Sequence, residues 1–118
     1  MISFKKLFSS FKNAFSGLKT VFKEEQSFRI QIAIAFIVFI IMFLFPLHYL
    51  ERISLVLVIC FVLGLELLNS QLERVCDLIT KDYDLRIKRI KDLSAAAVLI
   101  ASLDALLVGL FILLSHLL

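Results

Sequence analysis

Four oxygen-bearing side chains follow one another at helical spacing in the segment 66–77, which reads ELLNSQLERVCD. Steps of three, four and four residues separate Glu66, Asn69, Glu73 and Asp77. Because an α-helix turns by about 100° per residue, these steps keep the four side chains, here called the polar stripe, on one side of a single helix. The run before them, 53–65, is almost entirely aliphatic, as in a membrane span. Ionisable groups there are costly, so we interpret the polar stripe as a candidate functional site.

Phosphoryl transfer is the chemistry that the polar stripe suits. Carboxylate oxygens without a histidine or thiolate pair favour Mg²⁺ over zinc or iron. During phosphoryl transfer a metal ion bridges phosphate oxygens, a lysine neutralises charge, and a carboxylate orients or deprotonates the attacking hydroxyl. If the helices pack as a bundle, the stripe comes within reach of Glu25, Lys91 and Asp92. A face with several polar residues is also typical of a solvated or bundle-packing surface, so spacing alone leaves both interpretations open.

The sequence lacks the motifs of several other classes of protein. There is no Gly-rich phosphate loop, which excludes a soluble-type kinase or a P-loop enzyme. No histidine is placed for a Ser/His/Asp arrangement, and Cys60 and Cys76 lack CxxC spacing, so we interpret both cysteines as packing residues. The net charge of +3 comes without long basic runs, so we expect no nucleic-acid partner.

The composition places the chain in a membrane. Of its 118 residues, 61% are hydrophobic, which is too apolar for an ordinary soluble domain. Three apolar stretches, at about 28–47, 52–80 and 92–116, are long enough to cross about 30 Å of hydrocarbon as helices. Between the last two, the densely charged segment 81–92 is expected to be a hydrated loop. We therefore predict an all-α membrane protein with one domain, residues 1–118.

The N-terminal segment 3–23 predicts an amphipathic helix. Apolar residues recur at steps of three and four, with lysines mostly between them; they are Phe4, Leu7, Phe8, Phe11, Phe15, Leu18 and Phe22. An aromatic face opposite a basic face is typical of a helix that lies in the membrane interface. The alternative is a helix whose aromatic face packs against its own bundle. The segment has no apolar core followed by a cleavage site, so we expect it to stay on the mature protein.

The distribution of positive charge predicts the orientation. Six lysines and arginines precede the first span and five lie in 81–92, whereas only Arg52 flanks the first turn. The positive-inside rule then places the N-terminus and 81–92 in the cytoplasm and the C-terminus outside. We expect a multi-pass protein of the bacterial cytoplasmic (inner) membrane. Asp104, in the middle of the third span, suits either a buried polar contact or a role with substrate.

Two motifs resemble a known family, the small prokaryotic diacylglycerol kinases and their undecaprenol kinase relatives. The matching segments are ELLNSQLERVCD at 66–77, KDLSAAAVLIA at 91–101 and, upstream, GLKTVFKEEQSFRI at 17–30. The resemblance covers almost the whole chain. The family consists of trimeric integral membrane enzymes that transfer the terminal phosphate of ATP to a lipid alcohol. The resemblance therefore implies a homotrimeric bundle and a lipid kinase that uses ATP and Mg²⁺.

The resemblance also implies a role for individual residues. Glu66 corresponds to the catalytic base, and Asn69 and Asp92 support catalysis. Magnesium would be bound by Glu25 and Glu73. The residues near the nucleotide would be Lys91, Asp92, Asp77, Glu25, Glu73, Asp82, Tyr83 and Lys6. The lipid hydroxyl would approach sideways from the membrane, beneath the N-terminal helix, next to Glu66, Phe22, Phe28 and Arg29.

The sequence departs from the family pattern at two points. Asp84 stands where members commonly have histidine, and Asp104 has no counterpart. For the substrate we expect diacylglycerol, which would become phosphatidic acid, with undecaprenol as the alternative. Two other classes stay open. A small multidrug transporter also has a buried glutamate but uses four spans, and a non-catalytic assembly protein would have no need of the polar stripe together with Lys91 and Asp92.

Overall fold

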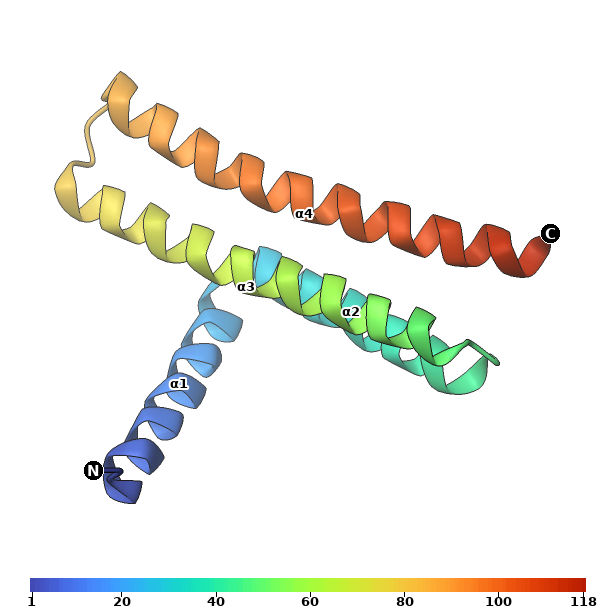
Figure 1. Ribbon diagram of the computed structural model, residues 1–118. Helices are drawn as coiled ribbons and strands as arrows, with labels where there is room; N and C mark the ends of the chain where they lie inside the picture. Colours follow the sequence, from blue (N-terminus) through green and yellow to red (C-terminus); the bar gives the residue numbers. More distant parts are fainter.

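The computed structural model describes residues 1–118 and contains four α-helices and no strands. They are α1 (Phe4–Glu24), α2 (Gln26–Leu44), α3 (Tyr49–Ile79) and α4 (Leu85–Leu117). Helices α2, α3 and α4 lie side by side, and α1 leaves them at a steep angle (Figure 1). By length and composition, α2, α3 and α4 could each cross a membrane. The predicted all-α architecture, an amphipathic helix followed by three spans, is confirmed.

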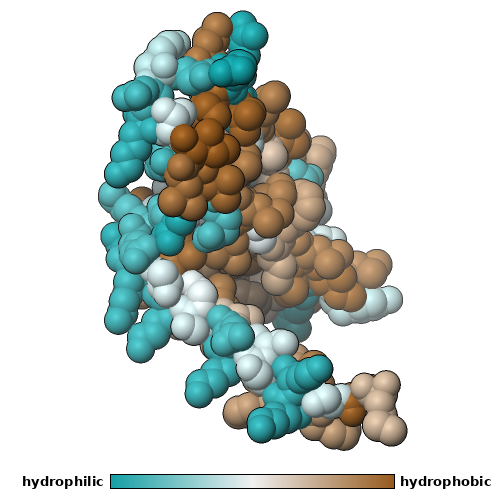
Figure 2. Space-filling view, turned by 90° about the vertical axis from the view of Figure 1, so that its left-hand side faces the viewer, coloured by the Kyte–Doolittle hydropathy of each residue, from teal (hydrophilic) through white to brown (hydrophobic).

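Helix α1 keeps its aromatic face away from the rest of the chain. Its first turn is capped by Ser3, whose hydroxyl oxygen accepts a hydrogen bond from the Lys6 N–H at 3.4 Å. Val21 is its only buried residue, and Phe4, Phe8 and Phe15 are exposed. The chain's own bundle therefore does not cover this face, which favours the membrane-interface interpretation. In Figure 2 the same helix forms the arm that extends away from the bundle, with hydrophilic residues along one side.

Helix α4 begins earlier than predicted. It starts at Leu85, so the expectation that all of 81–92 is a loop was wrong, and only Thr80–Asp84 connects α3 to α4. The Asp84 carboxylate caps the helix by accepting from the Arg86 N–H at 2.8 Å. Charged residues such as lysine and arginine are good helix formers, so charge density alone does not end a helix. The half-buried positions 87, 91, 94 and 98 continue the face that α4 turns towards α3.

The spans pack through a narrow set of buried side chains. On α2, Phe28, Ala35 and Met42 are buried and recur every seven residues, which keeps them on one side of the helix. Between α3 and α4 the least exposed residues are Ala101, at 1%, and Cys76, at 2%. Small residues let helices approach closely in lipid, where van der Waals contact drives association. Cys76 is buried, which agrees with a packing role, whereas Cys60 is exposed within the single chain.

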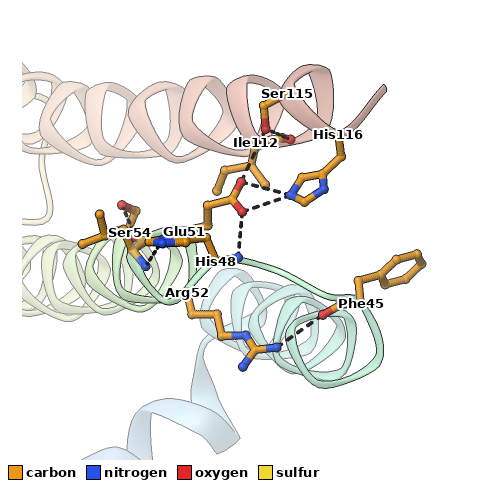
Figure 3. A network of polar contacts seen from close by, with 9 residues as sticks. Phe45, His48, Glu51, Arg52, Ser54, Ile112, Ser115 and His116 are labelled. Atoms are coloured by element: carbon orange, nitrogen blue, oxygen red, sulfur yellow. Dashed lines mark hydrogen bonds and ion pairs between the residues drawn. The ribbon is translucent and has the colours of Figure 1, made fainter. Parts of the chain in front are cut away.

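A polar network joins the ends of the spans opposite the α3–α4 loop (Figure 3). Glu51 accepts from the His48 backbone N–H at 2.9 Å and lies 3.0 Å from Nε2 of His116 on α4. The Arg52 guanidinium donates to the Phe45 carbonyl at the end of α2, at 3.3 Å. These contacts hold the ends of α2, α3 and α4 together where the apolar packing ends.

We expect Ala101→Leu to destabilise the bundle. The residue is almost fully buried, so added methylene groups have no space and overpacking costs about 1–3 kcal/mol. Thermal unfolding in detergent micelles should show a lower Tm than the wild type. Ala97→Leu, at an exposed position of the same helix, is the matched control. Equal melting temperatures for all three proteins would show that Ala101 does not limit the approach of the helices.

Candidate active site

The polar stripe lies on α3 where α2 and α1 meet, and α3 continues past this junction to Ile79 (Figure 1). Two of the polar residues of this part of α3 are buried inside a single chain, Glu66 at 7% and Ser70 at 3% exposure. Buried polar groups normally have hydrogen-bond partners, because desolvation is otherwise not compensated. The partners of these two residues come from α2 and from its N-cap residue, Glu25.

Glu66 accepts one hydrogen bond from another helix. The Gln31 Nε2 atom on α2 lies 3.3 Å from Glu66 Oε2. No cation contacts this carboxylate. The proposed base is thus a buried acid that a neutral amide orients.

Glu25, between α1 and α2, forms the tightest cluster of the site. Its Oε1 atom accepts from Ser70 Oγ at 3.0 Å and from Arg74 Nη2 at 3.1 Å. Arg74 also forms an ion pair with Glu24 at 2.7 Å. Because the guanidinium and the hydroxyl stabilise the ionised form, the pKa of Glu25 lies below its ordinary value of 4.5. The carboxylate of Glu25 is therefore ionised at neutral pH.

The remaining members of the polar stripe have separate partners. The Asn69 amide lies 3.5 Å from Glu73 Oε1, at the outer limit of a hydrogen bond, and Asn69 Oδ1 is buried without a partner. Asp77 pairs with Lys91 of α4 at 2.8 Å. Lys91 therefore reaches the stripe, as expected. Asp92 does not, because it pairs with Lys88 along α4 at 2.6 Å.

Other residues assigned to the nucleotide or the lipid lie around this cluster. Asp82 and Tyr83 are exposed in the α3–α4 loop, and Lys6 is exposed in the first turns of α1, at the far end of that helix. Phe28 is buried, whereas Phe22 is exposed. The structure therefore brings Glu25, Glu66 and Lys91 to one end of the bundle but leaves Lys6 away from it.

Arg29 and Asp84 both take part in local capping. The Arg29 guanidinium donates to the carbonyls of Phe22 and Lys23 at 2.9 and 2.8 Å, so it caps the last turn of α1. Asp84, at the position where family members commonly have histidine, accepts from the Arg86 side chain, and this lowers its pKa below the ordinary range. Asp104 is exposed on α4 and forms no hydrogen bond within the chain.

Three residues of the site escaped the sequence analysis: Gln31, Ser70 and Arg74. Gln31 is the only polar residue of α2 after Arg29, and this interruption of an apolar run was the signal that could have revealed it. Arg74 follows Glu73 directly, and it could have been matched with the Glu24–Glu25 pair as the nearest opposite charge. Ser70 carried no distinguishing signal, because serine is common in closely packed membrane helices.

The oxygen atoms of this cluster suit a hard divalent cation. The chain holds no group of three or more histidine, cysteine, aspartate or glutamate side chains close enough to bind a metal by themselves. Mg²⁺, however, is usually bound by one or two carboxylates together with phosphate oxygens and water. Glu25 and Glu73 supply carboxylates, and the unpartnered Asn69 Oδ1 is a further oxygen donor beside Glu73. The residues therefore fit Mg²⁺ bound together with a polyphosphate.

Comparison with known proteins decides the family. Residues 12–113 match the model of the family described as prokaryotic diacylglycerol kinase. The chain belongs to the prokaryotic diacylglycerol kinase family. It is 34% identical to the undecaprenol kinase of Bacillus subtilis over 112 residues, which cover 95% of this chain and 91% of that protein. Over 103 residues it is 30% identical to the diacylglycerol kinase of Escherichia coli, covering 87% of this chain and 84% of that one.

A third member is longer than this chain. The diacylglycerol kinase of Synechocystis is 37% identical over 104 residues, which are 87% of this chain but 59% of that protein. The matched residues 12–113 contain Glu25, the whole polar stripe and Lys91, so every residue of the cluster lies inside the diacylglycerol kinase homology. The sequence-based resemblance to this family is confirmed, and with it the assignment of the chain as a lipid kinase.

The lowered pKa of Glu25 predicts a pH-dependent contribution to stability. A carboxylate with a depressed pKa stabilises the fold fully above its ordinary pKa and loses this contribution as the pH falls through the folded value. Glu25→Gln, which mimics the protonated acid, should therefore melt at a lower temperature than the wild type at neutral pH. The difference in Tm should narrow as the pH falls below 4.5.

Thermal unfolding in detergent micelles without ATP or lipid, at a series of pH values, measures this difference. The control is Asp82→Asn, because the Asp82 side chain is exposed and has no partner. This variant should melt at nearly the same temperature as the wild type. A constant difference for Glu25→Gln would contradict the proposed contribution of the Glu25–Arg74 contact.

Proposed function

We propose that this protein transfers the γ-phosphate of ATP to the hydroxyl group of a membrane lipid, diacylglycerol, and so makes phosphatidic acid. The observation that carries the proposal is a buried carboxylate, Glu66, at the membrane end of a cluster of anionic and cationic groups. Perturbed and buried ionisable groups gather at active sites. Members named diacylglycerol kinase support this substrate.

In this mechanism Glu66 accepts the proton of the lipid hydroxyl. The lipid oxygen then forms a bond to the γ-phosphorus, the bond from that phosphorus to the β–γ bridging oxygen breaks, and ADP leaves. Lys91 neutralises phosphate charge, and Asn69 supports the base. Asp92, which pairs with Lys88 in the single chain, would have to exchange this partner to support the base as well. Glu25 and Glu73 would hold Mg²⁺, which when bound neutralises the charge of the phosphate oxygens. Asp77, Asp82, Tyr83 and Lys6 are assigned to the nucleotide.

The lipid would reach Glu66 from the side. An apolar groove of about 570 Å³ runs between α2, α3 and α4, and Gln31, the partner of Glu66, lines it. Figure 2, seen from the loop end of the bundle, shows hydrophilic residues at the top, along the left margin and on the lower arm, and mostly apolar residues across the middle and the right. Phe22, Phe28 and Arg29 lie at the α1–α2 junction, where a headgroup at the membrane surface would meet the chain. This arrangement supports entry from the bilayer, beneath α1, and entry of ATP from the water.

Undecaprenol is the second candidate substrate. The relative in Bacillus subtilis that is named undecaprenol kinase matches over 95% of this chain. Both substrates present a primary hydroxyl attached to a long apolar body, so the same base and the same phosphate site would serve either. Diacylglycerol carries two acyl esters beside its hydroxyl, whereas undecaprenol carries a single isoprenoid chain. The choice between them therefore depends on the contacts that the protein makes with the lipid body.

The proposed place of the protein is the bacterial inner membrane, with the N-terminus in the cytoplasm and the C-terminus outside. The excess of lysine and arginine before α2 and at the start of α4 supports this orientation. ATP would then meet the site on the cytoplasmic side. The network of Glu51 and His116 lies at the opposite end of the spans, where no nucleotide would be available.

The assembly we propose is a homotrimer. Asp104 is exposed on a helix that could span the membrane, and an ionisable side chain exposed to lipid is costly. A second copy that covers this part of α4 would remove that cost. Chemical cross-linking of purified protein in micelles should give monomer, dimer and trimer and no larger species. A ladder that ends at the dimer would contradict the proposed assembly.

The test of the activity is transfer of labelled phosphate from ATP by purified protein in mixed micelles, with Mg²⁺, diacylglycerol and undecaprenol offered in separate reactions. We expect label in diacylglycerol and loss of that label when Mg²⁺ is chelated. Label in undecaprenol alone would reassign the substrate. Label in neither lipid, with folded protein, would overturn the kinase proposal.

Glu66→Gln should abolish this transfer without unfolding the protein. The amide has nearly the same shape but cannot accept the proton, and a general base contributes about 10²–10⁴-fold to the rate. The matched control is Glu51→Gln, the same substitution at the opposite end of α3, which should leave the specific activity unchanged. Wild-type activity in Glu66→Gln would refute the assignment of Glu66 as the base.

A further inference from the structure

Glu66 differs from the other paired carboxylates of the site in the kind of partner that it has. Glu25 contacts the guanidinium of Arg74, and Asp77 contacts the ammonium group of Lys91. Glu66 contacts only the amide of Gln31, at 3.3 Å. A cation beside a carboxylate strongly favours its ionised form and so makes it a weaker base. A neutral N–H donor orients the carboxylate at a smaller cost in basicity.

The amide of Gln31 has no other partner in the chain. Its Oε1 atom is buried and makes no hydrogen bond. The opposite orientation of the amide would bring this acceptor against an acceptor of Glu66, so the geometry requires the N–H group to face the carboxylate. Gln31 is also the only polar residue of α2 beyond Arg29, in the part of the helix that packs against α3. A buried amide in an apolar helix costs free energy unless its hydrogen bond compensates.

We propose that Gln31 is the positioning residue of the lipid phosphorylation: its Nε2–H group holds Glu66 Oε2 and leaves Oε1 free to accept the proton of the lipid hydroxyl. This inference rests on the proposed function, because it assigns Gln31 a role through the base. Gln31 also lines the apolar groove, so the residue that holds Glu66 lies next to the space that the lipid body would occupy. Glu25 and Asp77, in contrast, each have a cationic partner.

The first test is Gln31→Leu, which keeps a similar volume and removes the donor. Measured in mixed micelles with ATP and the lipid that the wild type phosphorylates, kcat should fall about tenfold or more, since general-base catalysis depends on orientation. The KM for ATP should not change. Gln71→Leu is the control, because it is the same substitution at an exposed position of α3 whose side chain does not contact Glu66. Its kcat should equal that of the wild type.

The second test is Gln31→Glu, which keeps the shape of the side chain. The new carboxyl group can donate a hydrogen bond to Glu66 only while it is protonated. While the pair shares one proton, the new carboxyl group can donate to Glu66; at higher pH both groups ionise and repel each other. We expect kcat of this variant to fall at high pH where the wild type keeps its activity. The other carboxylates close to Glu66 are Glu73 on α3 and Glu25, and both are present in the two proteins compared.

The outcomes of these tests distinguish the role of Gln31 from the kinase proposal itself. An active wild type with unchanged kcat in Gln31→Leu, and no added loss at high pH in Gln31→Glu, would overturn the role of Gln31 and leave the kinase proposal intact. A folded wild type that labels neither lipid would overturn both. If Gln31→Leu does not fold, the pH profile of Gln31→Glu decides alone, because a merely structural role would not produce the loss at high pH.

Discussion

The structure depends on one constraint, which is that carboxylates at the end of a membrane span need partners from other elements. Glu25 accepts hydrogen bonds from Ser70 and Arg74 of α3, and Glu66 accepts one from Gln31 of α2. Asp77 forms an ion pair with Lys91 of α4. Glu66 is buried and Glu25 is partly buried, so leaving either acid without a partner would be costly. The contacts that satisfy the acids therefore also fix how α2, α3 and α4 meet at this end. In this protein the candidate site and the packing of the bundle are the same set of interactions.

The two ends of the bundle use polar contacts differently. At the end opposite the α3–α4 loop, Glu51 contacts the backbone N–H of His48 and the ring of His116, so its carboxylate oxygens have hydrogen-bond partners. At the loop end, Asn69 Oδ1 and Gln31 Oε1 stay without partners although they are buried. Unsatisfied buried polar atoms in a folded protein need an explanation, and one such explanation is a site that binds substrate or metal. This asymmetry supports the proposed position of the active site, at the end of the bundle where the positive charge of the chain gathers.

The sequence predicted what periodicity can encode. The apolar lengths of α2, α3 and α4, the two faces of α1 and the polar stripe of α3 all follow from spacing within one segment. Contacts between helices follow from their rotation and register, which spacing does not give. Lys91 was correctly expected beside the stripe, but Asp92 turned to Lys88 because a partner one helical turn away competes with a distant one. The roles of Gln31 and Arg74 likewise could not be predicted from spacing, because their partners lie on other helices.

Two polar groups of the single chain lack a partner in different surroundings. Asn69 Oδ1 is buried without a hydrogen bond beside Glu73, and the oxygen chemistry of this region suits a cation with phosphate. Asp104 lies alone on the exposed surface of α4, where lipid would be a poor environment. In the proposed function, a nucleotide with its metal would supply the partner of Asn69, and a second copy of the chain would cover Asp104. Because the two residues lie on different helices, substrate binding and assembly would depend on different contacts of the same small bundle.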